Sequence, residues 1–305
     1  MYRRIGFLLA LLYATLLALR PVQADELPKA AATGAEKQQA SKFVRLVRNA
    51  EDEPTAMQTA IVTFARPDAK DYPTVDLVGA VHVGEKSYYE TLNQSFTKYD
   101  VVLYELVAPA GTRVPKGRKA NNAHFSGAVQ NGMKNVLELE HQLELIDYTQ
   151  PNMVHADMSP EDFNKSMTDR GESFLGMLFK VMGQSMAQPQ AKNKNLDAQL
   201  LVALFDKNRA ITLKRLMAEQ FEELETSMGL FSGKDGSTII TERNKVALKQ
   251  LAQELQSGKK RIAIFYGAGH MQHMEEQLVE QFKLTRTSEL WLTAWNLSQP
   301  EAVAN

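Results

Sequence analysis

Residues 75–82 read VDLVGAVH, and this stretch decides how the chain folds. Its first four residues form a short apolar run typical of a buried strand, and Gly79 lets backbone come close to a neighbour or a ligand. A helical pattern follows over residues 85–97, and residues 101–104 (VVLY) form a second apolar run. Strand, helix and strand at this spacing predict a βαβ unit with a parallel pair of strands.

Strand patterns continue on both sides of this unit. Upstream, residues 43–47 alternate as a half-buried strand does, and residues 59–64 are suited to pair with them. Near the C-terminus, the pattern predicts a buried strand at 261–265, a helix at 271–282 and a final strand at 289–295. The sheet is therefore expected to contain segments from both ends of the chain.

The middle of the chain is mainly helical in pattern. Ser159 and Pro160 form a helix start, with a capping side chain followed by proline at the first helical position. Helices are expected at 129–145, 161–186, 195–205, 208–228 and 238–256. We therefore expect an α/β fold: a mixed central sheet formed by two βαβ-like halves, with a helical insertion at about 125–257 between them.

The first 24 residues are typical of a cleavable secretory signal peptide. Arg3 and Arg4 precede an uncharged apolar stretch over residues 5–19, which is short for a membrane span, and residues 22–24 (VQA) suit signal peptidase. We expect an exported protein, periplasmic or secreted, with no stable membrane span after cleavage. Residues 25–42 would form a flexible mature N-terminus, and residues 43–305 a single domain.

Composition limits the chemistry. The chain has no cysteine, so it has no disulfide, thiolate nucleophile or thiolate metal ligand. Its net charge of −1 gives no sign of a nucleic-acid partner. A polypeptide or a small molecule is the expected substrate, and histidine, glutamate and arginine remain as the chemical groups.

One local pattern occurs twice. Residues 78–82 (VGAVH) and 266–270 (YGAGH) both end a predicted strand and precede a helix. Ligands of open α/β sheets bind outside the carboxyl ends of the strands. A single copy is more often an ordinary loop, but two copies on the strands expected to be central point to a functional site that contains His82 and His270.

Glu105 lies at the same kind of position, directly after residues 101–104. A carboxylate at a buried strand end is costly unless it is paired or bound to a cation. Its candidate partners are a metal ion, Arg243, or one of the two histidines. Spacing alone would place Arg243 on a solvated helix face.

Taken in order, these segments resemble a known family. The sequences GAVH at 79–82, Glu105, ERN at 242–244 and GAGH at 267–270 are similar to those of the TraB/GumN family. That family belongs to the wider group containing the Tiki proteases and, more distantly, the erythromycin esterases and ChaN-like proteins. The resemblance extends from about residue 59 to residue 295.

The resemblance implies one pocket in which the two histidines and the glutamate meet. In the Tiki branch the activity is metal-dependent cleavage of peptide bonds, with Mn or Co implicated. Carried over by position, His82 and His270 would be metal ligands or catalytic histidines, and Glu105 a ligand or general base. Arg243 would pair with Glu105 or stabilise an oxyanion. Two imidazoles and a carboxylate suit a divalent ion, Mn, Co or Zn, with an open water position.

Other residues near these motifs have expected roles as well. Ligand contacts are expected from Gly79, Gly267, Gly269 and Tyr266, which lie in or next to the two repeated motifs. His273 is expected to be a surface residue of the first turn of its helix. Asp157 is expected mainly to shape the loop before Ser159, with contact to the pocket as a weaker option.

Three hypotheses of function follow. The first is an exported metal-dependent hydrolase, a peptidase with a His/Glu/His site. The second is a metal-independent hydrolase with His82 or His270 as the base and Glu105 orienting it. The third is a non-catalytic protein that binds or inhibits, holding a peptide, haem or metal. No Ser-His-Asp hydrolase is expected, because the sequence has no Gly-x-Ser-x-Gly elbow.

Overall fold

The structure is a computed structural model. It describes residues 43–69, 71–109, 111–115, 117, 137–173, 203, 206, 208–228 and 236–298. The predicted signal peptide, the predicted flexible segment up to residue 42 and the predicted helix start at 129–136 lie outside the described residues, as does most of the predicted helix at 195–205.

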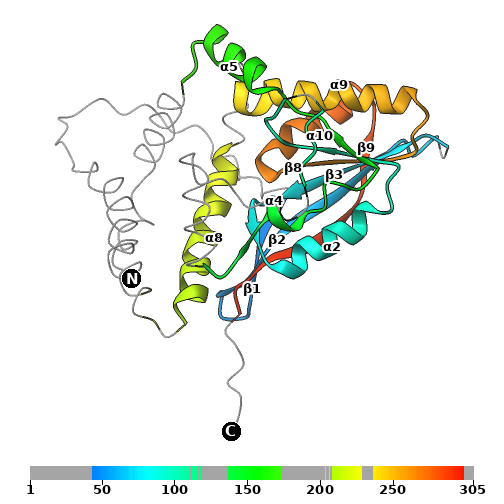
Figure 1. The fold of residues 1–305 in the computed structure, drawn as a ribbon. Coiled ribbons are helices and arrows are strands. Elements are labelled where there is room, and N and C mark those ends of the chain that lie inside the picture. The colour runs from blue at the N-terminus through cyan, green and yellow to red at the C-terminus, as the bar shows by residue number, and fades with distance from the viewer. Residues whose placement is uncertain are drawn as a thin grey trace, which may run out of the picture. The chain divides into compact units, whose positions relative to one another are not determined.

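A mixed sheet of seven strands forms the centre of the described part (Figure 1). Its strands are β1 (Val44–Arg48), β2 (Pro54–Ala65), β3 (Thr74–Ala80), β5 (Val101–Tyr104), β7 (Met153–His155), β8 (Arg261–Gly267) and β9 (Thr285–Asn296). The order is β1-β2-β3-β8-β5-β7, and β9 also pairs with β2. Strands β3, β8, β5 and β7 run parallel, whereas β2 is antiparallel to β1, β3 and β9. The expected α/β fold with a mixed central sheet is confirmed.

One pairing expectation is wrong. The strands predicted to form a parallel pair, β3 and β5, are not neighbours, because β8 lies between them and pairs with both. Val75 and Val101 both face Ile262 of β8 in the register. The pattern of residues 75–104 identified both strands and their direction, but nothing local shows that a strand from far along the chain separates them.

Helices cover both faces of the sheet. The described helices are α2 (Lys86–Phe96), α4 (Gln142–Leu145), α5 (Pro160–Asp169), α8 (Arg209–Met228), α9 (Arg243–Gln256) and α10 (Met271–Glu280), with a π-helical turn η2 (Thr238–Glu242) and a 3-10 turn η3 (Ala268–His270). In Figure 1, α2 lies on one side of the sheet and α9 and α10 lie on the other.

Most expected helices are present, with two corrections. The helix expected over 129–145 is confirmed only at its end, as α4, because Glu140 and His141 form a strand, β6, that pairs with β4 (Val83–Gly84) in a small two-stranded sheet. The helix expected over 161–186 ends at Asp169, since Gly171 takes a positive φ of 63° that a helix does not allow, and residues 174–186 of that prediction lie outside the described residues.

The core consists of two apolar layers, one on each face of the sheet. Along β8, Ala263 and Phe265 contribute to the layer beneath α2, whereas Ile262, Ile264 and Tyr266 pack towards α9 and α10. This alternation follows from the period of two in a strand. Because both faces are covered, the parallel strands are mainly apolar, with exceptions such as Asp76 of β3.

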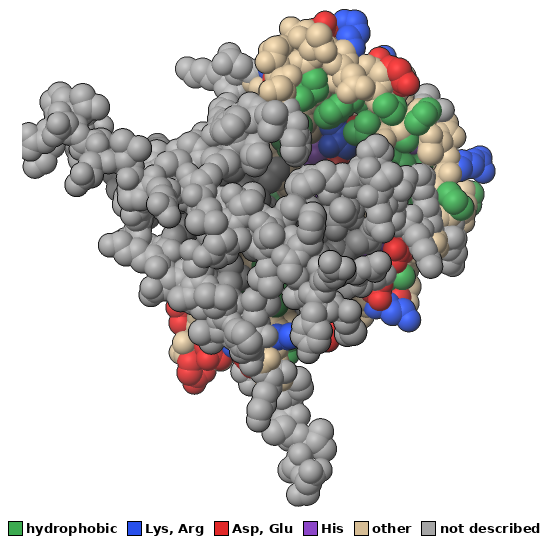
Figure 2. Space-filling model, turned by 60° about the vertical axis from the view of Figure 1, so that its left-hand side comes forward, with side chains coloured by type: hydrophobic (Ala, Val, Ile, Leu, Met, Phe, Trp, Pro, Cys, Tyr) green, Lys and Arg blue, Asp and Glu red, His purple; other side chains and the backbone are tan. Residues whose placement is uncertain are grey.

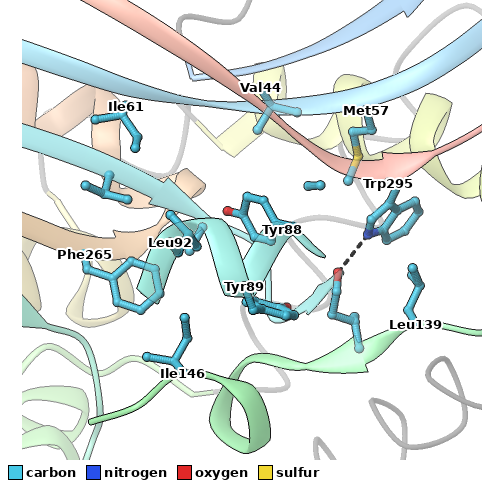
Figure 3. Packing of buried hydrophobic residues seen from close by; sticks show 14 of the residues in the cluster. Val44, Met57, Ile61, Tyr88, Tyr89, Leu92, Leu139, Ile146, Phe265 and Trp295 are labelled. Carbon is cyan, nitrogen blue, oxygen red and sulfur yellow. Dashed lines mark hydrogen bonds between the residues drawn. The ribbon is translucent and has the colours of Figure 1, made fainter. Parts of the chain in front are cut away.

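The last strand closes the layer on the α2 side. Trp295 of β9 is fully buried beside Met57, and its indole Nε1 donates to the carbonyl oxygen of Val83 at 2.7 Å, drawn as a dashed line in Figure 3. Val83 directly follows His82, so the C-terminal strand supports the segment that carries one of the two motif histidines. Among the described helices, none has the length and apolar character that crossing a membrane requires.

Candidate active site

The residues singled out at the strand ends meet at one edge of the sheet. His82 follows β3, Glu105 follows β5, and Asp157 follows β7, while His270 ends the 3-10 turn that follows β8. Because these strands are parallel, their carboxyl ends lie at the same edge, which is where ligands bind in open α/β sheets. Arg243 joins them from the first position of α9.

Glu105 is the centre of the cluster. Its Oε1 accepts from Arg243 Nη2 at 2.6 Å, and its Oε2 accepts from the backbone N–H of Gly267 at 2.6 Å. Burial alone would raise the pKa of this carboxyl group, but His270, Arg243 and His82 and the N–H of Gly267 together hold it well below its usual range. Glu105 is therefore a carboxylate at neutral pH.

Arg243 is held between two carboxylates. Its Nε and Nη2 donate to the two oxygens of Asp157 at 3.0 and 2.5 Å, and Nη2 also reaches Glu105. The side chain of Asp157 is wholly buried. Burial would lower the pKa of the guanidinium, but the charges of Glu105 and Asp157 raise it above its ordinary value. The two-point contact with Asp157 fixes the plane of the guanidinium as well as its position.

His270 is buried and neutral. Burial is the main reason that its pKa falls to about 4, although the charge of Glu105 opposes this shift. Its Nδ1 lies 2.6 Å from Asn244 Oδ1. Its Nε2 lies 3.6 Å from Glu105 Oε1 and 3.5 Å from Arg243 Nη1.

His82 and Gly267 define the open side of the cluster. A Cβ atom placed on Gly267 would lie 3.3 Å from Glu105 Oε2, 3.8 Å from His270 Cδ2 and 4.0 Å from His82 Nε2. The missing side chain of Gly267 therefore leaves a small space on which these three side chains converge. His82 is exposed, whereas His270 is buried, so the two histidines differ in access to solvent.

The surroundings are hollowed. Figure 2 shows histidine and basic side-chain atoms, in purple and blue, at the bottom of a hollow that hydrophobic side chains border. Asp157 also lines a cavity of about 490 Å³, whose other walls come from α5, η2 and α9. Most of the residues that line this cavity are charged or polar, among them Asp162, Lys165 and Arg170.

The structure brings His82, Glu105, Arg243 and His270 together. Among the predicted ligand-contact residues, Gly267 lies inside the cluster and Gly269 within η3. Gly79 lies elsewhere: a Cβ there would meet Ala60, Met271 and Ala268.

Tyr266 contacts the cluster through the ring of His270 and the backbone next to Asp157. Its hydroxyl donates to the carbonyl oxygen of Ala156, and its ring makes an edge contact with that of His270 at 5.2 Å. Arg243, which spacing alone placed on a solvated helix face, is buried instead, because two carboxylates pair with it.

Sequence reasoning missed the roles of Asp157 and Asn244. Asp157 was expected mainly to shape a loop, yet its carboxylate binds Arg243. The signal available was the same as for Glu105: Asp157 follows a short strand, β7, whose three residues MVH were too few to predict as a strand. Asn244 was noted only as part of the motif at 242–244. Its contacts with His270 join elements that are 26 residues apart in the sequence, which no local pattern predicts.

The cluster fits the expected metal ion only in part. The donor types are suitable, but both oxygens of Glu105 already accept bonds from protein N–H groups. The guanidinium of Arg243 lies 3.5 Å from His270 Nε2, so an ion in this gap would meet a fixed positive charge. Within the described ranges, no group of three or more His, Cys, Asp or Glu side chains has the arrangement of a metal site. The arrangement does not favour an ion here, and the Mn, Co or Zn site stays a prediction.

Comparisons with protein-family models, with curated proteins and with solved structures found no match for this chain.

Proposed function

We propose that this chain is an exported hydrolase, a member of the TraB/GumN family, that cleaves a peptide bond with water activated at His270. The observation that carries the proposal is the position of the buried His270 Nε2, which lies 3.6 Å from a carboxylate oxygen of Glu105 and 3.5 Å from a guanidinium nitrogen of Arg243. A neutral imidazole flanked by both signs of charge suits proton transfer coupled to attack on a carbonyl group.

In this proposal His270 is the general base. Its Nε2 holds a water molecule and takes a proton from it as the oxygen attacks the carbonyl carbon. The imidazolium that forms is stabilised by Glu105, whose carboxylate stays ionised. The role of Glu105 is electrostatic, because its two oxygens are already held by Arg243 and Gly267.

Arg243 and His82 complete the proposed reaction. Arg243 supplies a permanent positive charge beside the base, where the oxyanion of a tetrahedral intermediate would develop. Asp157 fixes that charge in place before substrate arrives, so no reorganisation is needed during the reaction. The proton that His270 has taken from the water then passes to the leaving amine, and His82, exposed at the open side, is placed to relay it, so that both imidazoles return to their starting state.

The substrate class rests on two observations. The resemblance to the Tiki branch favours a peptide bond. The cavity beside the cluster shares only Asp157 with it, and its lining is mainly charged, so a part of the substrate that entered this cavity would be polar, because an apolar group would desolvate these side chains without pairing them. A peptide bond in a polar stretch of polypeptide is therefore the proposed target.

The test is a product assay on the exported protein. The full chain is expressed with its own leader, the exported product is purified, and a peptide library is incubated with it in the presence and absence of a chelator. We expect new peptide termini by mass spectrometry, unaffected by the chelator and lost in His270→Gln and Glu105→Gln. Lys249→Ala, an exposed position on the helix that carries Arg243, is the matched control and should keep activity.

Other results would overturn the proposal in distinct ways. Activity that the chelator abolishes, with one ion per chain that His270→Ala loses, would support the metal-dependent hydrolase instead. Stoichiometric retention of peptide, haem or metal without any product would support the binding protein. Unchanged activity in both site variants would place the chemistry elsewhere in the chain.

A further inference from the structure

Asn244 is fully buried, and both the nitrogen and the oxygen of its side-chain amide make hydrogen bonds. Its Nδ2 lies 3.0 Å from the backbone oxygen of His270 and 3.0 Å from Nδ1 of His273, while its Oδ1 lies 2.6 Å from Nδ1 of His270. The three residues come from three elements, α9, η3 and α10. The amide is therefore a link between two histidine rings.

The orientation of this amide is decided by its partners. A carbonyl oxygen can only accept, so the atom of Asn244 that faces the backbone oxygen of His270 must be the donor nitrogen. The amide oxygen then faces His270 Nδ1, which must carry the proton. The other side of the ring does not decide the tautomer, because Nε2 lies 3.5 Å from Arg243 Nη1, which can only donate, and 3.6 Å from Glu105 Oε1, which can only accept.

His273 supplies the second acceptor of the Asn244 amide. One N–H of Nδ2 is used by the backbone oxygen of His270, and the other points at Nδ1 of His273. That nitrogen must carry a lone pair, which places the proton of a neutral His273 on Nε2. His273 is partly buried at the first turn of α10, where a surface residue was expected.

We propose that Asn244 and His273 are positioning residues that hold His270 in the tautomer with a proton on Nδ1 and a free lone pair on Nε2. The inference rests on the proposed function, since the lone pair on Nε2 is what a general base requires. Without the link, the proton can occupy either nitrogen of the ring, and a ring protonated on Nε2 cannot accept a proton from water at that atom.

The tautomer is measured directly by nitrogen NMR of the full chain labelled with 15N-histidine, with His270→Gln used to assign the signals. In the unaltered protein we expect His270 to show an N–H at Nδ1 and a lone-pair nitrogen at Nε2. In Asn244→Leu we expect this pattern to give way to a mixture of both tautomers. A proton on Nε2 in the unaltered protein, or an unchanged pattern in the variant, would overturn the proposal.

Kinetics test the consequence for turnover. Partners that orient a functional histidine typically contribute about 10- to 100-fold, so kcat should fall by that factor in Asn244→Leu while KM stays within about twofold. His273→Leu should show a smaller loss of kcat in the same direction, and His273→Gln, which offers an acceptor oxygen, should recover part of it. Gln272→Ala, an exposed neighbour on α10, is the matched control.

The outcomes separate this inference from the proposed function. If the unaltered protein cleaves nothing, the proposed function fails, and the NMR measurement still decides the tautomer. If Asn244→Leu does not fold, the spectrum of the unaltered protein and the His273 variants carry the test. A rise in KM with kcat unchanged, or no recovery of kcat in His273→Gln relative to His273→Leu, would indicate a merely structural role.

Discussion

At the scale of single residues, Arg243 shows how a buried charge is kept. Arg243 is 8% exposed, and its guanidinium makes two contacts with Asp157 and one with Glu105. Burying a charge is tolerated when partners replace the water that it loses. Asp157 therefore stabilises the folded protein around Arg243, whereas the proposed role of Glu105 is in the chemistry.

Removing the charge of Asp157 should destabilise the protein. In Asp157→Asn the guanidinium keeps Glu105 but loses its two-point partner, and breaking a buried pair typically costs about 3 kcal/mol or more. We expect a reduction of this size in the free energy of unfolding, measured by chemical denaturation. Asp169→Asn is the control: its partner Lys165 is exposed, and because solvent screens such a surface pair, the loss should be much smaller. Equal losses in the two variants would contradict the prediction.

Asp76 gives a prediction for the pH dependence of stability. It accepts from the hydroxyl of Tyr99 at 2.6 Å, and burial raises its pKa above the ordinary value of 3.8, although that bond opposes the shift. Between the unfolded and the folded pKa the native state binds more protons, so stability falls as pH rises through that window. The free energy of unfolding of the unaltered protein relative to Asp76→Asn should therefore decrease from about pH 4 upward and then level off. A difference that rises with pH would contradict the assignment.

Residues also show what the sequence could predict of the candidate site. His82, Glu105 and His270 follow apolar runs long enough to be recognised as strands, so their position at the sheet edge could be inferred. Asp157 follows a strand of three residues, MVH, which has too few residues for an alternation to be visible. Its pairing with Arg243 joins positions that are 86 residues apart, which no local pattern encodes.

At the scale of elements, local chemistry predicted where α5 begins. Ser159 caps the helix, its hydroxyl accepting from the N–H of Asp162 at 3.0 Å, and Pro160 occupies the first helical position. The end of α5 is set by Gly171, although the sequence pattern predicted a helix that continues to residue 186. Start signals are local hydrogen bonds, whereas the end here is set by one backbone conformation.

The cap of α5 is testable on its own. Ser159→Ala removes the acceptor for the N–H of Asp162, and the loss of such a cap typically costs about 1 kcal/mol. We expect that reduction in the free energy of unfolding, together with faster hydrogen exchange in the first turn of α5. Ser159→Asp, which keeps an acceptor oxygen, should retain most of the stability. An alanine variant as stable as the unaltered protein would show that the cap contributes nothing.

Strand order shows the limit of the sequence at the same scale. Each of β3, β5 and β8 was predicted from its apolar run, but the position of β8 between the other two was not. Hydrophobic period reports which faces are buried and says nothing of which strand is the neighbour. The consequence is favourable for the candidate site, since the central position of β8 places His270 between His82 and Glu105 along the sheet edge.

At the scale of the whole molecule, the candidate site combines segments from both ends of the domain. Its residues extend from His82 to His270, and β9, which follows them in sequence, pairs with β2 near the start of the domain. Trp295 of β9 fills the layer beside Met57 and bonds the carbonyl oxygen of Val83. The last strand therefore links the stability of the sheet to the segment that carries His82.

Trp295 should accordingly be among the costliest side chains to lose. Trp295→Ala removes a fully buried indole and leaves a cavity, for which about 3–5 kcal/mol of destabilisation is typical. Trp291→Ala is the matched control on the same strand: that ring is partly exposed and packs against Arg45, so its loss should cost well under half as much. Denaturant midpoints of the two variants decide the comparison. Comparable losses would mean that β9 is held by its backbone pairing with β2, and that the layer around Trp295 adds little.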